Sequence, residues 1–544
     1  MGVFFAGVVI LIIISAAEKI TINSPIVDNE NIYSNADNSG VVKELYITVM
    51  PINGQPENSA FTFSELNELI YEDIKVNVIF QEGINGMSNP GQFGFGLTDA
   101  NATMELRGQS SRRLDQKSYK INLDKNVGFW EGFQTINLSK HSRDPVKIRN
   151  KLSFDLFKGV SNFTSLRTQF VHVFIKDFSQ ENYSQEYVDY GLFTLIENVD
   201  KDFLKNHGLD NKGSLYKAEN FEFYRYPGNI TFKEDNNYKK SEFEQILEIK
   251  GNDDHSKLIA MLDDVNNSYL HINEVIEKYF DRENYLTWLA VNFLVGNIDT
   301  SSRNYYLYSP TDSNKWYFLP WDYDGTWGWY EKLGQESYIA PWQSGVSNYW
   351  GVVLHQRFLK NDQNRADLVK KVEELSALFT TEKIVTLIDG YKLLITEYLM
   401  REPDNEIIKG SEAIMDAEFE LIVSSIEANK LKFFQSLEKP MPVFMGSPTN
   451  IGDYITFNWT KSYDFQNDQL EYIIEISKTP DFHELVYRAE GIIETEHLVS
   501  GLGSGTYYWK LAIRDSEGNV QVPFDTYIDS LRNYYFGVQK FLVN

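Results

Sequence analysis

The sequence contains no cysteine. This absence excludes disulfide bonds, thiolate nucleophiles and cysteine-based metal sites at once. Positive charge is also scarce, since 51 Lys and Arg stand against 77 Asp and Glu and give a formal net charge of −26. Such a surface repels phosphate backbones, so nucleic acid is not expected as a partner, and an anionic ligand needs a local cluster of basic residues.

Long apolar runs are missing beyond the first residues. The apolar segment 3–14 is followed by Ser15, Ala16 and Ala17, a small-residue pattern that suits a signal peptidase. Its length is typical of a secretory signal rather than of a membrane span. We therefore predict a signal peptide over residues 1–17, with an uncleaved anchor as the alternative because a basic start is absent. Cleavage predicts a secreted or cell-surface protein without a stable membrane span, and the lack of disulfides favours a bacterial source.

The 544 residues include 42% hydrophobic and 15% aromatic residues, which is enough for more than one core. Residues 18–40 are polar and predict a linker. From residue 41 the alternation of β-branched and aromatic residues predicts strands, and from about residue 242 the spacing predicts helices. A helix is expected over residues 143–158, and the segment 283–294, apolar on nearly every side, predicts a buried helix. The fold class is therefore expected to be α+β.

A separate C-terminal unit is expected over residues 439–544. Short alternating segments follow one another there at roughly ten-residue spacing, which is the pattern of an all-β sandwich. Trp459 and the strand Tyr507-Tyr508-Trp509 resemble those of a fibronectin type III-like module.

The first segment with candidate catalytic residues is GNIDTSSRNYYLY, residues 296–308. Asp299 and Asn304 lie five positions apart, between an apolar helix and an aromatic strand. A carboxylate that accepts a hydroxyl proton, followed by an amide that binds a metal, is what phosphoryl transfer from a nucleotide requires. The alternative is structural, with Asp299 as a helix cap and Asn304 as a turn residue.

The second segment is KWYFLPWDYDGTWG, residues 315–328. A short hydrophobic strand ends in Asp322-Tyr323-Asp324-Gly325, and the two carboxylates offer hard oxygen ligands to Mg²⁺ or Mn²⁺ where the chain reverses. The alternative is an ordinary Asp-Gly turn.

The third segment is a basic Gly/Ser loop followed by a strand. Its backbone N–H groups suit phosphate oxygens, and a lysine on the next strand adds a point charge. The alternative is a solvated basic hairpin. The candidate residues are Arg107, Gly108, Ser110, Ser111, Arg112, Lys117 and Lys120.

These segments occur in one order with RDPVKIRNKLSFDLF, YGLFTLIENVDKDFL and GSLYK. In that order they resemble the spore coat protein H (CotH) family of atypical secreted protein kinases, over about residues 42–435. The resemblance implies an atypical two-lobed protein-kinase-like fold. A CotH-like kinase domain is accordingly expected over residues 41–438.

The resemblance also implies roles for the acidic residues. Asp299 would be the catalytic acid/base and Asn304 the second metal ligand. Asp322 would be the first ligand of Mg²⁺, with Asp324 as the competing choice. Asn297 stands where ordinary kinases have a histidine, so their signature is only partly kept.

The basic residues receive roles in the same way. Lys120 is the first choice for the phosphate-binding lysine and Lys117 the competitor, and only one of them should point at the nucleotide because they lie on opposite faces of a strand. Glu197 is either a nucleotide contact or a structural ion-pair partner. Arg149 and Asn150 either orient the lysine or contact phosphate, or they form a packed surface pair.

The predicted function is transfer of the γ-phosphoryl group of ATP to Ser or Thr hydroxyls of a protein substrate, with Mg²⁺ or Mn²⁺. One alternative is a non-catalytic cell-surface or scaffold protein with a kinase-like domain. Another keeps the site but transfers the nucleotidyl group, because both reactions use the same phosphate cradle.

Overall fold

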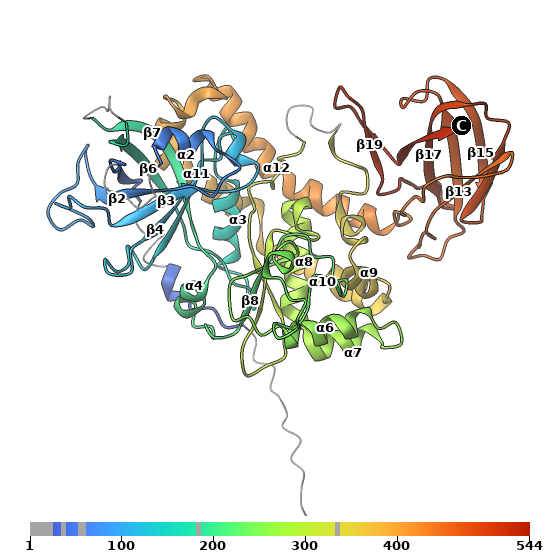
Figure 1. Cartoon of the computed structure of the whole chain (residues 1–544), viewed down its shortest axis with the longest axis horizontal. Coiled ribbons are helices and arrows are strands. Elements are labelled where there is room, and N and C mark those ends of the chain that lie inside the picture. Colours follow the sequence, from blue (N-terminus) through green and yellow to red (C-terminus); the bar gives the residue numbers. More distant parts are fainter. Residues whose placement is uncertain (1–25, 34–39, 53–60, 181–185, 332–337, 544) are drawn as a thin grey trace, which may run out of the picture.

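The structure is a computed structural model that describes residues 26–33, 40–52, 61–180, 186–331 and 338–543 (Figure 1). The predicted signal peptide over residues 1–17 lies outside the described residues, as does most of the predicted linker 18–40. Within the described part, α-helices and β-strands are mixed and the C-terminal region is rich in sheet. No helix of this part is both long enough and apolar enough to cross a bilayer.

The N-terminal region is a closed barrel of antiparallel neighbours, completed by a parallel pair between its first and sixth strands. Alternate side chains fill the barrel, and helix α2 (Phe63–Glu68) packs Phe63 and Leu66 against that core. In the order of their pairing, the strands are β1 (Lys43–Val49), β2 (Lys75–Gly83), β3 (Ala102–Leu106), β4 (Tyr119–Leu123), β5 (Thr135–Ser139), β7 (Val188–Glu197) and β6 (Thr168–Asp177).

The second region combines an antiparallel sheet with most of the helices (Figure 1). The sheet runs in the order β11 (Tyr317–Pro320), β10 (Tyr305–Ser309), β8 (Ser214–Ala218) and β9 (Leu247–Ile249). The helices are α3 (Arg149–Phe157), α4 (Lys201–Asn206), α5 (Lys240–Phe243), α6 (Ser256–Asn266), α7 (Ile272–Tyr279), α8 (Arg282–Val295), α9 (Val353–Leu359), α10 (Asp362–Leu378), α11 (Thr381–Leu399) and α12 (Glu412–Leu437).

Helix α8 confirms the predicted buried helix. Every residue from Asn284 to Val295 is buried, because β11, α10 and α12 surround the helix. The Asp281 side chain accepts from the Asn284 N–H and caps the start, and Gly296 ends the helix with φ 68°, a conformation that glycine adopts without steric cost.

Helix α3 begins later than the predicted range. It spans Arg149–Phe157, whereas a helix was expected from residue 143. Pro145 disfavours a helical conformation at the residue before it, and Lys147 has φ 55°. The first part of the predicted helix is therefore an irregular segment.

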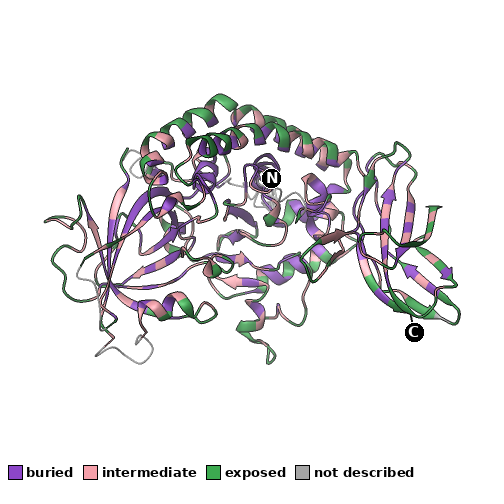
Figure 2. Cartoon of the chain, turned by 90° about the horizontal axis from the view of Figure 1, so that it is seen from above, coloured by how far each residue is buried: buried purple, intermediate pink, exposed green. Residues whose placement is uncertain are grey.

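The C-terminal region contains two main sheets around one core, as the strand spacing predicts. Trp459 and Trp509 lie in this core. Figure 2 shows buried positions alternating along its strands at the right, beside the C label. One sheet contains β12 (Thr449–Ile451), β13 (Tyr454–Asn458) and β16 (Glu496–Ser500). The other sheet contains β15 (Leu485–Ile492), β14 (Glu471–Ser477), β17 (Gly505–Arg514), β18 (Val520–Gln521) and β21 (Val538–Val543). A separate hairpin consists of β19 (Thr526–Ile528) and β20 (Tyr534–Phe536). The likeness to a fibronectin type III module stays a prediction.

A buried histidine makes the helical region sensitive to acid. His355 on α9 is fully buried, hydrogen-bonds to the Tyr285 hydroxyl at 2.6 Å and stacks near Trp288, and burial lowers its pKa from 6.5 to about 3. Below pH 6.5 the unfolded chain therefore binds a proton that the folded chain does not. The free energy of unfolding is expected to fall by about 1.4 kcal/mol per pH unit from pH 6.5 toward the folded pKa.

Thermal unfolding of the wild type and of His355→Gln at pH 6.5 and 4.5 checks this expectation. The variant should lose less stability than the wild type over this interval. His483→Gln, at a histidine whose side chain is 83% exposed, is the control and should behave as the wild type. Equal acid sensitivity of wild type and His355→Gln would contradict the expectation.

Candidate active site

The segment between α8 and β10 brings Asp299 and Asn304 into direct contact. The Asn304 side-chain amide donates to a carboxylate oxygen of Asp299 at 2.9 Å and to its backbone carbonyl at 3.2 Å. Asn304 has φ 59°, which confirms a turn conformation. The cap of the short helix η3 (Ile298–Thr300) is Asn297, however, so the Asp299 carboxylate is not used as a helix cap.

The turn after β11 carries the two other candidate acids. Asp322 also has φ 59°, an uncommon conformation that aspartate tolerates better than most residues. The side-chain nitrogen of Asn297 lies 3.5 Å from the Asp322 carbonyl oxygen. The side-chain oxygen of Asn297 accepts from the Asp299 N–H. Asn297 therefore links the two loops.

The charges of the three aspartates act on one another. Burial, followed by the charge of Asp324, raises the pKa of Asp322 to about 7, and Asp299 adds to this effect. Burial also raises the pKa of Asp299, with a further contribution from Asp324. Burial favours a higher pKa for Asp324 too, but hydrogen bonding and the charge of His141 outweigh it, so that the pKa of Asp324 is lowered.

The aspartates remain accessible although protein surrounds them. The exposed fraction of the side chain is 54% for Asp299 and 55% for Asp324. The three acids are not a complete cage, since in the described part of the chain they do not form a group whose ligand atoms all lie within 4.8 Å of one another. Proteins usually bind Mg²⁺ through one or two carboxylates, while substrate phosphates and water supply the other ligands, so two of these acids would suffice to hold such an ion.

Helix α3 holds the turn that carries Asp322 and Asp324. Arg149 is fully buried and its Nε donates to the Thr326 carbonyl at 2.9 Å. The Asn150 side-chain oxygen accepts from the Tyr323 N–H at 3.1 Å. Both residues are buried, so the interpretation as a surface pair is wrong, and each of them hydrogen-bonds to the turn.

Two basic residues stabilise the ionised form of Asp322. After burial and Asp324, the charges of Arg107 and Lys217 are the next influences, and both lower its pKa. Arg107 lies at the end of the barrel strand β3, with its guanidinium carbon 5.4 Å from the centre of the Trp321 ring, and it hydrogen-bonds to the Ser139 hydroxyl. Lys217 lies on β8 opposite Tyr306 of β10. The barrel and the sheet therefore both contribute charge to this site.

The two candidate lysines differ in their contacts. Tyr119 and Ile121 point into the barrel, so Lys120 points outward, where its ammonium lies 2.9 Å from the Glu105 carboxylate. Lys117 instead donates to the Arg112 carbonyl at 2.7 Å. Lys120 is therefore on the outer face of the barrel.

The Gly/Ser loop closes largely on itself. Gly108 has φ 81°, and a side chain there would collide with the Ser111 hydroxyl. The Ser111 hydroxyl donates to the Arg107 carbonyl at 3.0 Å, and Ser110 precedes the short helix η2 (Ser111–Arg113). The Arg112 guanidinium contacts the Asp73 carboxylate at 3.2 Å. Of the two loop arginines among the candidates, Arg107 is the one whose charge lowers the pKa of Asp322 and Asp324.

A family model described as CotH kinase protein matches residues 104–430, more than half of the chain, and contains every acid of the site. The chain belongs to the CotH family. It is 28% identical to the inner spore coat protein H of Bacillus subtilis (strain 168) over 315 residues, which cover 55% of this chain and 81% of that protein. It is 24% identical to invasin CotH3 of Rhizopus delemar over 249 residues, which cover 42% of this chain and 38% of the invasin.

Within the CotH match, Glu197 makes the contacts of an ion-pair partner. Its carboxylate lies 2.6 Å from Arg167 and 3.1 Å from His207, and all three side chains are buried. Burial opposes ionisation, but the charges and hydrogen bonds of His207 and Arg167 outweigh it and lower the pKa of Glu197 to about 2. His207 also contacts Asp28 at 2.6 Å. Of the two roles that we considered for Glu197, a nucleotide contact and a structural ion-pair partner, these contacts favour the second.

Three residues of the candidate site are absent from our sequence-based candidates. Lys217 acts on Asp322 through its charge, and His141 acts on Asp324 through hydrogen bonding and charge. The hydroxyl of Tyr330 has its pKa raised by burial and then by Asp299, Asp324 and Asp322. Tyr330 also lines a pocket of about 380 Å³ beside the Asp299 loop. Other residues around this pocket are Asn297, Ile298, Asn348, Tyr349 and Lys432.

Proposed function

We propose that this CotH protein is an extracytoplasmic protein kinase that transfers the γ-phosphoryl group of ATP to Ser or Thr hydroxyls of a protein substrate. The observation that carries the proposal is the arrangement of two loops, one with Asp299 and Asn304 in contact and the other with Asp322 and Asp324, which the Asn297 side chain links. In this proposal, the barrel and the helical region correspond to the two lobes of a protein kinase.

Asp299 has the properties of a group that orients a substrate hydroxyl and accepts its proton. Its carboxylate is accessible, and Asn304 fixes its direction. Its pKa is raised toward the operating pH, which improves a general base. The pocket beside Tyr330 offers space near this carboxylate for the residue that carries the hydroxyl.

Asp322 and Asp324, with Asn304, are the residues that would hold Mg²⁺ or Mn²⁺. When bound, such an ion neutralises charge on the phosphates of ATP. Arg107 and Lys217 surround the same acids with positive charge, which suits phosphate oxygens. Lys120 and its partner Glu105 form an ion pair on the barrel, comparable to the pair that positions the phosphate-binding lysine in kinases.

A surface location is part of the proposal. It is supported by the predicted signal peptide and by relatives named as a spore coat protein and an invasin. A protein is therefore the expected substrate, although those names identify none for this chain.

Transfer of label from ATP tests the proposed function directly. Full-length chain is incubated with Mg²⁺ or Mn²⁺ and ATP labelled either at the α or at the γ phosphate, alone and with a mixture of Ser/Thr-containing proteins. Label from γ and not from α supports the kinase. Label from α would instead identify nucleotidyl transfer, and no label from either position would favour the non-catalytic binding protein.

The candidate lysines are expected to separate in the same assay. Lys120→Met and Lys217→Met should each raise the KM for ATP about tenfold, because one charge-assisted phosphate contact contributes on the order of 1.4 kcal/mol. Lys117→Met is the matched control and should leave KM unchanged, since the Lys117 ammonium binds the Arg112 carbonyl and lacks the carboxylate partner that Glu105 provides for Lys120. A larger effect of Lys117→Met than of Lys120→Met would reverse the assignment of these two lysines.

A further inference from the structure

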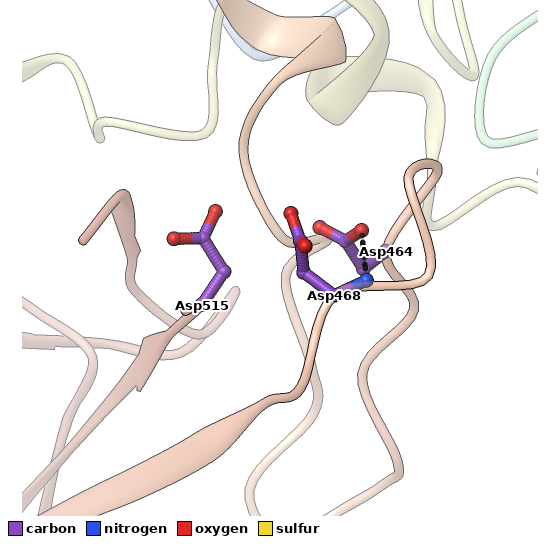
Figure 3. Close-up of side chains that lie close together, drawn as sticks. All are labelled: Asp464, Asp468 and Asp515. Atoms are coloured by element: carbon purple, nitrogen blue, oxygen red, sulfur yellow. Dashed lines mark hydrogen bonds between the residues drawn. The ribbon is translucent and has the colours of Figure 1, made fainter. Parts of the chain in front are cut away.

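Three aspartates of the C-terminal region bring their carboxylates close together, outside the candidate active site (Figure 3). Asp464 and Asp468 lie in the loop before β14, and Asp515 directly follows β17. One carboxylate oxygen of each lies within 4.8 Å of the others, and no other group of three acidic or histidine side chains in the described part of the chain meets this criterion.

One carboxylate oxygen in the cluster is buried without a hydrogen bond. Asp464 is only 5% exposed. Its Oδ1 accepts from the N–H groups of Gln466 and Asp468, each at 2.9 Å, while its Oδ2 is buried and has no hydrogen-bond partner. Figure 3 shows this second oxygen directed at the carboxylate of Asp468. Burying such an oxygen beside other carboxylates is costly unless a cation binds there.

The surroundings orient the acids without neutralising them. Both carboxylate oxygens of Asp515 accept hydrogen bonds from Asn519. One accepts from the backbone N–H at 2.7 Å and the other from the side-chain amide at 2.8 Å. Asp468 accepts from the Ser516 hydroxyl at 3.2 Å. The donors that these hydrogen bonds bring to the three carboxylates are neutral N–H and O–H groups, which do not balance the negative charge. Hydrogen bonds of this kind fix the direction of metal ligands.

We propose that Asp464, Asp468 and Asp515 form a Ca²⁺ site. The ligand set consists of carboxylate oxygens on two loops, and Ca²⁺ prefers oxygen ligands in a flexible geometry, whereas Mg²⁺ is seldom held by such an all-protein set. Cys is absent from the chain, which with the acidic donor set argues against a zinc site. Water and loop carbonyls would complete the coordination.

The site lies where the C-terminal region meets the CotH region. Tyr463 and Phe465 flank Asp464, and their rings lie 5.5 and 5.8 Å from that of Trp350. The Gln466 amide donates to the Leu437 carbonyl at the end of α12 at 3.1 Å, and the Asn519 amide donates to the Glu438 carbonyl at 3.0 Å. Both loops of the site thus contact the end of α12, so Ca²⁺ binding orders this junction.

Calorimetric titration of the full-length chain with CaCl₂ after EDTA treatment tests the site. The chain carries Asp322→Asn, so that an ion at the candidate active site is not counted. One Ca²⁺ per chain is expected, and Asp464→Asn or Asp468→Asn should abolish its binding. Asp453→Asn, at an exposed aspartate of the same region, is the control and should bind one equivalent.

Thermal unfolding keeps the proposal testable where a variant alters folding. Saturating Ca²⁺ should raise the unfolding temperature of the chain by roughly 5 °C or more. In EDTA, Asp464→Asn should be at least as stable as the wild type, because it removes charge repulsion, whereas in Ca²⁺ it should be less stable. An absent shift, or equal shifts in wild type and Asp464→Asn, would overturn the proposal, and an equal shift with Mg²⁺ would overturn the assignment to Ca²⁺.

Discussion

Replacing Asp299 with asparagine is expected to lower the rate of phosphoryl transfer by about 10³-fold, within the range that general-base catalysis contributes. Asparagine keeps the shape of the side chain and an oxygen that can accept from the Asn304 amide. In the wild type this amide donates to the Asp299 carboxylate at 2.9 Å. Asparagine cannot accept the proton of a substrate hydroxyl. The KM for ATP should therefore change little while kcat falls.

The control for Asp299→Asn is an aspartate that lies next to the same two strands but outside the site. Asp312 is exposed in the turn between β10 and β11, at the opposite end from Asp299 and Asp322, and Asp312→Asn should retain the wild-type rate. A small effect of Asp299→Asn on kcat, or a loss of nucleotide binding in its place, would remove this residue from the role of proton acceptor.

The second large effect is expected from Arg149→Met. The Arg149 guanidinium contacts Asp144 at 2.6 Å and Glu418 at 2.5 Å, and all three side chains are buried. Its removal takes a shared positive charge from two buried carboxylates, which typically destabilises a protein by about 3–5 kcal/mol. The contact with the Thr326 carbonyl is lost as well, so the turn that carries Asp322 loses a support.

Urea unfolding and the transfer assay together measure this effect. Arg149→Met should lower the unfolding midpoint and the activity, and adding Glu418→Gln should restore part of the stability because it removes one of the two carboxylates. Arg401→Met is the control, since Arg401 pairs with Glu397 at the surface and should change the stability by less than about 1 kcal/mol. A stable and fully active Arg149→Met protein would contradict the account of how the turn is held.

The loops of the site could be predicted because their signals are local. Asp299 and Asn304 follow a helix that is apolar on every side, and Asp322 and Asp324 follow a short buried strand, so both pairs were expected at loop positions. The aromatic strand after Asn304 was expected for the same reason. These elements agree with the structure because burial on all sides leaves few alternatives for such segments.

Contacts that depend on strand register could not be predicted. Lys217 acts on Asp322 because β8 pairs with β10, and nothing near Lys217 in the sequence specifies that pairing. The partners of Glu197 are Arg167, directly before β6, and His207, at the end of α4. The start of α3 was misplaced because the predicted range included Pro145, which disfavours a helical conformation at the residue before it.

The aspartates of the C-terminal region show the same limit. Asp464 and Asp515 are separated by about half of that region in sequence, and the pairing of Glu471 on β14 with Arg514 on β17 brings their loops together. Their positions in loops are visible in the sequence, but their proximity is a property of the sheet.

Binding of a nucleotide to the acidic site is the most direct test of the central claim. A non-hydrolysable ATP analogue is titrated calorimetrically into the full-length chain at saturating Mn²⁺, with Asp322→Asn and Asp324→Asn as variants and Asp312→Asn as the control. The account predicts one equivalent bound by the wild type and the control, dependent on Mn²⁺, and at least tenfold weaker binding by the other two. Equal affinity in all four proteins, or binding that does not need a divalent ion, would contradict it.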